Sequence, residues 1–144
     1  MRREILIGRR ATAAVLTAAC ALSALMAVAQ TAPRTVRDGV FSAVQVQRGQ
    51  KIFRNICSNC HEIEEFIGPG AYLEEHDGKP LWETFDFIWS NMPDDDPSSL
   101  EPGEYAAVLA YLFSVYGLPT GEADLPIDRK ALELITITRP KPAG

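Results

Sequence analysis

The stretch Cys57-Ser58-Asn59-Cys60-His61 sets two thiols three residues apart and an imidazole directly after the second thiol. In an exported chain, such a cysteine pair can form a disulfide. A thioredoxin-like redox pair would need strands around a helix, and the flanking sequence is helical in pattern. A zinc site needs about four Cys or His ligands. Beyond its alanine-rich first 29 residues, the chain contains two cysteines and two histidines, so a zinc site would have to use all four of them.

The same five residues fit Cys-x-x-Cys-His, the pattern of covalent haem attachment. The two thiols form thioether bonds to the haem vinyl groups, and the adjacent histidine lies under the iron. We therefore predict one haem c, held by Cys57 and Cys60, with His61 as the proximal iron ligand.

Three helical patterns surround this motif. The first runs from about Ala43 to Asn55, with Ser42 as N-cap and Gln45 as its capping-box partner. Gly49 inside this helix predicts a close crossing by another helix. The other two helices are expected at about Pro80–Asn91 and Pro102–Tyr116, where apolar residues recur at helical spacing. The stripe on the last helix is interpreted as core.

Met92 is the candidate sixth ligand of the iron. Pro93 disfavours the α conformation at Met92, so its thioether can leave the face of the preceding helix. It is also the only methionine after residue 29. Two alternatives stay open: Met92 fills the core, or His76 ligates the iron instead, although its surroundings read as a solvated turn.

The first 29 residues resemble a secretory leader. Four arginines in residues 1–10 precede an uncharged Ala/Leu-rich run that ends in Ala27-Val28-Ala29. We expect cleavage after Ala29, with an uncleaved membrane anchor as the alternative. The first 29 residues hold four arginines and one glutamate, so the remaining 115 residues carry a formal net charge of −8. That charge argues against binding to nucleic acid or to anionic membranes and favours a basic partner face.

Several short motifs together resemble the small class I c-type cytochromes. They lie between residues 40 and 118 and are Gly49-x-x-x-Phe53, Cys57-x-x-Cys-His61, Gly68-Pro69, Asn91-Met92-Pro93 and Ala110-Tyr111-Leu112. The flanking segments look especially like bacterial periplasmic cytochrome domains, found alone or joined to pyrroloquinoline-quinone dehydrogenases.

The resemblance implies an all-α fold with helices around one haem. We expect a signal peptide at residues 1–29, a linker at 30–39, a cytochrome c domain at 40–120 and a C-terminal extension at 121–144. The extension should pack on the domain through its apolar residues, with a short turn near Asp128–Leu132 and a disordered end. The resemblance also implies that a carbonyl near Pro69 accepts the Nδ1 hydrogen of His61 and that Gly49 and Phe53 cross Val108 and Tyr111.

Two features depart from the family pattern, and both bring negative charge close to the expected haem. The usual small residue after the haem histidine is Glu62, which is followed by Glu64 and Glu65. An acidic loop, Asp94-Asp95-Asp96, follows the ligand methionine.

The expected function is electron transport by a periplasmic monohaem cytochrome c that is not itself an enzyme. Its expected partners are periplasmic redox proteins, such as a quinoprotein dehydrogenase and a terminal oxidase or other cytochrome. The alternatives are a dedicated cytochrome subunit of a dehydrogenase complex and a haem enzyme with a labile sixth ligand. An uncleaved leader would make it a membrane-anchored protein facing the periplasm.

Overall fold

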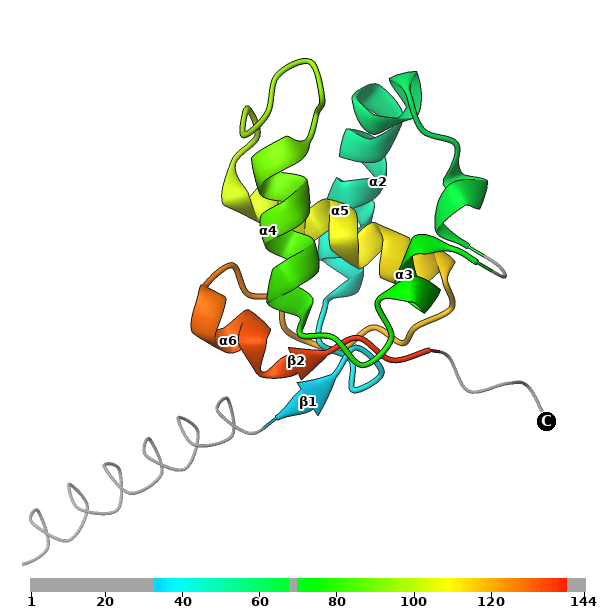
Figure 1. Ribbon diagram of the computed structural model, residues 1–144. Helices are drawn as coiled ribbons and strands as arrows, with labels where there is room; N and C mark the ends of the chain where they lie inside the picture. The colour runs from blue at the N-terminus through cyan, green and yellow to red at the C-terminus, as the bar shows by residue number, and fades with distance from the viewer. Residues whose placement is uncertain (1–32, 68–69, 140–144) are drawn as a thin grey trace, which may run out of the picture. The chain divides into compact units, whose positions relative to one another are not determined.

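A computed structural model describes residues 33–67 and 70–139 (Figure 1). The expected signal peptide at 1–29 lies outside these ranges, and so does the expected disordered end at 139–144 except for Arg139. Arg139 is described, and its backbone N–H donates to the carboxylate of Asp77 at 3.1 Å. The elements follow one another as β1 (Arg34–Thr35), α2 (Ala43–Asn55), η1 (Cys57–Asn59), η2 (Ile63–Phe66), α3 (Tyr72–Glu75), α4 (Leu81–Asn91), α5 (Pro102–Val115), α6 (Arg129–Glu133) and β2 (Ile135–Thr136). The described chain is thus mostly helical, as predicted, but it also contains a two-residue parallel strand pair that the sequence patterns did not indicate.

Helix α2 begins and ends at the predicted residues. The Ser42 hydroxyl caps it by accepting a hydrogen bond from the backbone N–H of Gln45 at 3.0 Å. The reciprocal half of the expected capping box is wrong. The Gln45 amide instead forms two hydrogen bonds with the backbone of Leu125, as acceptor at 2.7 Å and as donor at 3.2 Å. Because Gln45 is buried, these bonds satisfy an amide that would otherwise lack partners inside the protein.

Gly49 is the point at which α2 crosses α5, as predicted. A Cβ atom at this position would overlap the carbonyl of Ala107 and would lie 3.0 Å from the Cβ of Tyr111. One turn further along α2, the ring of Phe53 lies 5.5 Å from the ring of Tyr111, centre to centre. The missing side chain therefore lets the two helix backbones touch and brings Phe53 onto α5.

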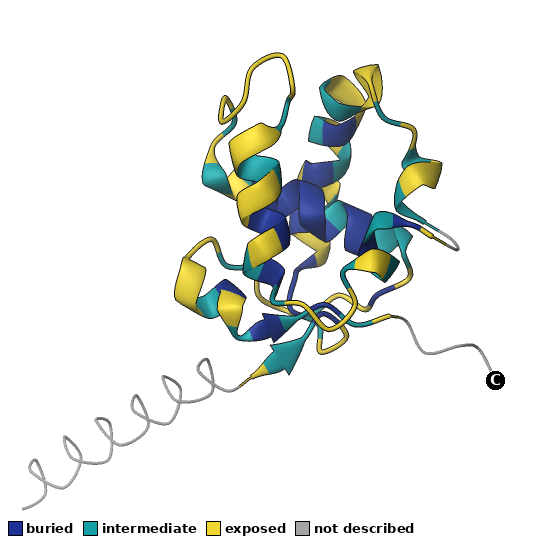
Figure 2. Ribbon diagram, in the orientation of Figure 1, coloured by how far each residue is buried: buried dark blue, intermediate teal, exposed yellow. Residues whose placement is uncertain are grey.

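Helix α5 forms the centre of the core, and both α2 and α4 pack against it. Eight of its residues are buried (Figure 2): Tyr105, Ala106, Ala107, Val108, Leu109, Ala110, Leu112 and Phe113. Helix α4 adds the buried side chains of Leu81 and Phe85. The apolar stripes predicted for these two helices are therefore core, and α5 holds α2 and α4 in one domain.

The C-terminal extension packs back on the domain, as its apolar residues suggested. Leu125, Leu132, Ile135 and Ile137 are buried, whereas Ile127 is half-exposed. The expected turn near Asp128 is helix α6, whose N-cap is the side chain of Asp128. No helix of the described residues is long and apolar enough to cross a membrane.

Part of the segment expected as a linker, residues 30–39, pairs with the C-terminal extension. Strand β1 pairs in parallel with β2, Arg34 opposite Ile135 and Thr35 opposite Thr136. Val36 is fully buried. The difference from the expected linker arises because β1 finds its hydrogen-bonding partner about 100 residues further along the chain, a pairing that no local pattern reveals.

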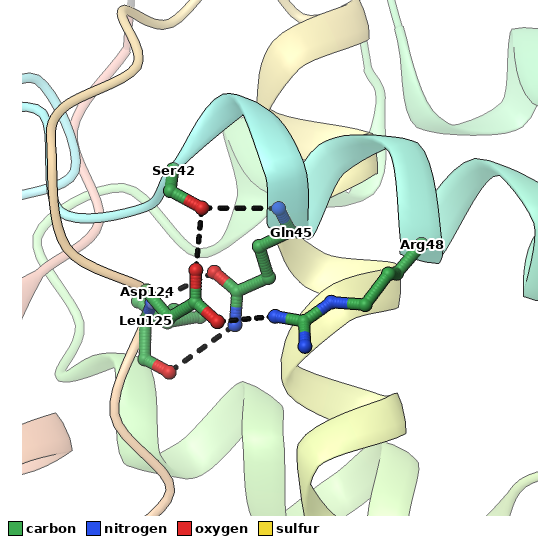
Figure 3. A network of polar contacts seen from close by, with 5 residues as sticks. All are labelled: Ser42, Gln45, Arg48, Asp124 and Leu125. Carbon is green, nitrogen blue, oxygen red and sulfur yellow. Dashed lines mark hydrogen bonds and ion pairs between the residues drawn. The ribbon is translucent and has the colours of Figure 1, made fainter.

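A polar cluster fastens the extension to the start of α2 (Figure 3). Asp124 accepts hydrogen bonds from the hydroxyl of Ser42 and from the guanidinium of Arg48. Gln45 holds the next residue of the extension, Leu125. The cap of α2 and the course of the C-terminal segment are therefore parts of one network.

Candidate haem-binding site

The two thiols and the imidazole of the motif are brought together in one tight turn directly after α2. Ile56 ends α2 with a hydrogen bond from its N–H to the carbonyl of Ile52. The carbonyl of Cys57 then accepts hydrogen bonds from the N–H of Cys60 at 3.2 Å and of His61 at 3.0 Å. These bonds close the chain on itself, so all three side chains project from a single turn.

Both cysteines are free thiols in the structure. Cys60 is exposed and Cys57 is half-buried. Burial raises the pKa of the Cys57 thiol above its ordinary value, so this thiol stays neutral at neutral pH. Within residues 33–67 and 70–139, no group of three or more Cys, His, Asp or Glu side chains could hold a metal ion. A zinc site therefore finds no support in the described part of the chain.

His61 lies beside the carboxylate of Glu65. The distance between His61 Nδ1 and Glu65 Oε2 is 3.0 Å. An ionised carboxylate only accepts hydrogen bonds, so Nδ1 carries the hydrogen and the lone pair is on Nε2. That lone pair is what an iron ligand must present. The carbonyl near Pro69, expected by resemblance to hold Nδ1, lies at residues the structure does not describe.

Partly buried apolar side chains surround the turn. Ile52, Cys57, Ile63, Phe66 and Tyr111 pack against the buried cluster of Phe53, Val108 and Leu112 without being fully covered themselves. The ring of His61 lies 5.6 Å from the ring of Phe66, edge to face. A half-covered apolar lining beside an exposed thiol, a half-buried thiol and an imidazole fits a flat, largely apolar group that is bonded at one edge.

Met92 directly follows α4, which like α2 packs on α5. It ends α4 with an extended backbone, φ −121° and ψ 147°, as the following proline predicted. Its carbonyl accepts a 2.7 Å hydrogen bond from the hydroxyl of Tyr105, which is buried in α5. The side chain of Met92 is only partly buried. In Figure 1, the end of α2 and the loop after α4 both extend upward from α5.

His76 lies in a turn, as expected, and the following residues 77–79 are exposed. Its own imidazole is held by further contacts. His76 caps the short helix α3, stacks on the ring of Tyr72 with 3.9 Å between ring centres, and donates from Nδ1 to the Tyr72 carbonyl at 2.8 Å. The imidazole is partly buried by these contacts. Its orientation is thus fixed by its own helix.

Two residues that position the candidate ligands were not identified from the sequence. The helical spacing of Tyr105 predicts a core position and gives no sign of its hydrogen bond to Met92, which lies 13 residues earlier in the chain. The sequence indicates only a negative charge at Glu65. Glu65 follows His61 by four residues and Glu62 by three. This spacing could have indicated its hydrogen bonds with His61 Nδ1 and with the backbone N–H of Glu62.

Residues 44–112 match the model of a protein family described as cytochrome C oxidase, cbb3-type, subunit III. The matched region runs from the first turn of α2 to near the end of α5 and includes both cysteines, His61 and Met92. No curated protein and no solved structure gives a significant match.

The family match supports a c-type cytochrome. A cytochrome c domain implies a haem group and electron transfer by that haem, and proteins of this kind are generally electron carriers rather than enzymes.

Proposed function

We propose that this protein is an exported monohaem cytochrome c that carries single electrons between periplasmic redox proteins, receiving them from a periplasmic dehydrogenase. The observation that carries this proposal is the turn at Cys57–His61, in which two free thiols and an imidazole are held together beside an apolar lining. The haem, when bound, supplies one-electron chemistry at its iron.

The residues of the chain have separate tasks in this proposal. Cys57 and Cys60 would bind the haem covalently, and His61 Nε2 and the thioether of Met92 would bind its iron. Tyr105 holds the backbone of Met92 in place from the buried helix α5. An iron bound by both His61 and Met92 would favour electron transfer over catalysis at the iron.

The charge pattern supports a partner with a basic docking face. From residue 56 to residue 128, the chain contains 16 acidic residues and a single basic one, Lys79. This segment includes the haem motif and Met92. Glu62 and Glu64, beside His61, and the loop Asp94–Asp96, beyond Met92, are exposed. Exposed acidic residues of this kind attract lysine- and arginine-rich surfaces and repel acidic ones.

Covalent haem attachment can be tested directly. The mature protein, expressed with the host's haem-attachment machinery, should retain haem stain after denaturing electrophoresis, with one haem per chain. The double substitution Cys57→Ser and Cys60→Ser should abolish the stain, whereas Ser58→Ala, in the same exposed turn, should keep it. Loss of haem from the wild-type chain on denaturation would contradict the proposal.

A further inference from the structure

Glu65 is held in place by two donors, and one of them is Nδ1 of His61, the nitrogen that would be left free if Nε2 bound the iron. One carboxylate oxygen contacts His61 Nδ1 at 3.0 Å. The other accepts a hydrogen bond from the backbone N–H of Glu62 at 3.1 Å, as part of the capping box that starts η2. Because both carboxylate oxygens are engaged, the side chain has a defined orientation toward the imidazole.

The carboxylate is ionised at neutral pH. A glutamate carboxyl ordinarily ionises well below pH 7. The bond to His61 is thus a charge-assisted hydrogen bond, which is stronger than a bond to a neutral carbonyl. A histidine ligand that donates its second N–H to a carboxylate is more basic toward its metal.

We propose that Glu65 is a positioning residue for the proximal ligand, and that its charged hydrogen bond to His61 Nδ1 lowers the reduction potential of the haem. This inference rests on the proposed function, because it requires His61 to ligate the iron. A more basic imidazole donates more electron density and so favours the ferric over the ferrous iron, and hydrogen bonding to the axial ligand is one way in which proteins set haem potentials.

The neighbouring Glu64 gives a matched control. It is exposed like Glu65, carries the same charge, belongs to the same short helix η2 and makes no hydrogen bond or ion pair with His61. A surface charge in water acts weakly on its surroundings, whereas the Glu65 hydrogen bond acts directly on the ligand. The two effects therefore separate when each glutamate is replaced in turn.

The test compares Glu65→Gln with Glu64→Gln in the haem-loaded protein by redox titration. We expect Glu65→Gln to raise the potential clearly more than Glu64→Gln, because glutamine can still accept the hydrogen bond but has lost the charge. A second readout is the iron–histidine stretching frequency of the ferrous protein in a Met92→Ala background, which should fall with Glu65→Gln and stay unchanged with Glu64→Gln.

Equal potential shifts in the two variants, or an unchanged stretching frequency, would overturn the role of Glu65. Such a result leaves the proposed function intact if the wild-type chain carries covalent haem with His61 as a ligand. Absence of covalent haem from the wild-type chain would instead defeat the proposed function itself. Circular dichroism of each variant shows whether the helices are retained, so a misfolded variant is recognised as such.

Discussion

The hydroxyl of Tyr105 donates a 2.7 Å hydrogen bond to the backbone carbonyl of Met92. It also accepts a weaker bond from the N–H of Leu100 at 3.3 Å. A buried side chain of α5 thereby ties both ends of the loop that carries the candidate ligand and the acidic residues Asp94–Asp96. The position of Met92 consequently depends on the central helix of the core.

Replacing Tyr105 by phenylalanine should loosen this loop. Loss of the hydroxyl leaves the Met92 carbonyl without its partner, which costs about 1–3 kcal/mol where the group is buried. We expect a decrease of about 1 kcal/mol in the free energy of unfolding, together with tighter binding of cyanide to the ferric haem protein. Tyr111→Phe is the control, since the Tyr111 hydroxyl forms no hydrogen bond with the described residues. Equal cyanide affinities in the two variants would argue against a role for Tyr105 in holding Met92.

Substitution of Met92 tests its ligation. A thioether favours the ferrous iron, so Met92→His should lower the reduction potential while the iron stays six-coordinate, and Met92→Ala should allow carbon monoxide or cyanide to bind. Haem potentials in proteins span roughly 0.8 V, so redox titration should resolve the change easily. If His76 is the ligand, His76→Ala will change the potential and Met92→Ala will not. An unchanged potential in both Met92 variants would show that Met92 only fills space.

Gly49→Ala should strongly destabilise the fold. The added methyl group would overlap the backbone of Ala107, which belongs to the buried helix α5 and cannot move aside alone. Overpacking of this kind costs typically 1–3 kcal/mol, and we expect about 3 kcal/mol by denaturant unfolding. Gly103→Ala, in the first turn of α5, meets no atom within 4 Å and should be neutral or stabilising by up to about 1 kcal/mol. Similar stabilities for both variants would contradict the close crossing.

Asp124 should make the stability of the protein depend on acid pH. Hydrogen bonds from Ser42 and then Arg48 lower its pKa below the ordinary value of 3.8. Its folded pKa is lower than its unfolded pKa, so its stabilisation is fully present above pH 3.8 and is lost as the pH falls through the folded value.

Asp124→Asn should therefore lower the thermal unfolding midpoint at neutral pH, and the difference from the wild type should shrink in acid. The carboxylate is nearly half exposed, so we expect an effect below about 1 kcal/mol. Glu122→Gln, exposed on the same segment, should leave the pH profile unchanged. A constant difference between Asp124→Asn and the wild type at all pH values would contradict this linkage.

Electron transfer to a basic redox partner should slow as salt is added. The segment that holds the haem motif is strongly acidic, and salt screens surface charges over about 8 Å at physiological ionic strength. Stopped-flow mixing of the reduced protein with a lysine-rich and with an acidic acceptor cytochrome measures this effect. The rate with the lysine-rich acceptor should fall with salt, and the rate with the acidic one should rise. Rates that do not depend on salt would exclude charge steering.

Features that depend on neighbours along the chain could be predicted from the sequence. Caps, prolines and periodicity within a few residues predict four features: the bounds of α2, the N-cap Ser42, the extended backbone at Met92 and the helical stripe of α5. The spacing of Cys57, Cys60 and His61 also belongs to this class, because one turn of chain suffices to bring them together.

Features in which distant residues meet could not be predicted in this way, because they depend on how the elements pack. Gln45 has a local partner available in Ser42 but bonds to Leu125 instead, because burial demands that both ends of its amide be satisfied. Strand β1 pairs with β2 from the far end of the chain. Tyr105 reaches Met92 only because α4 packs on α5. Hydrogen bonds between elements depend on how those elements pack, and no local pattern encodes that packing.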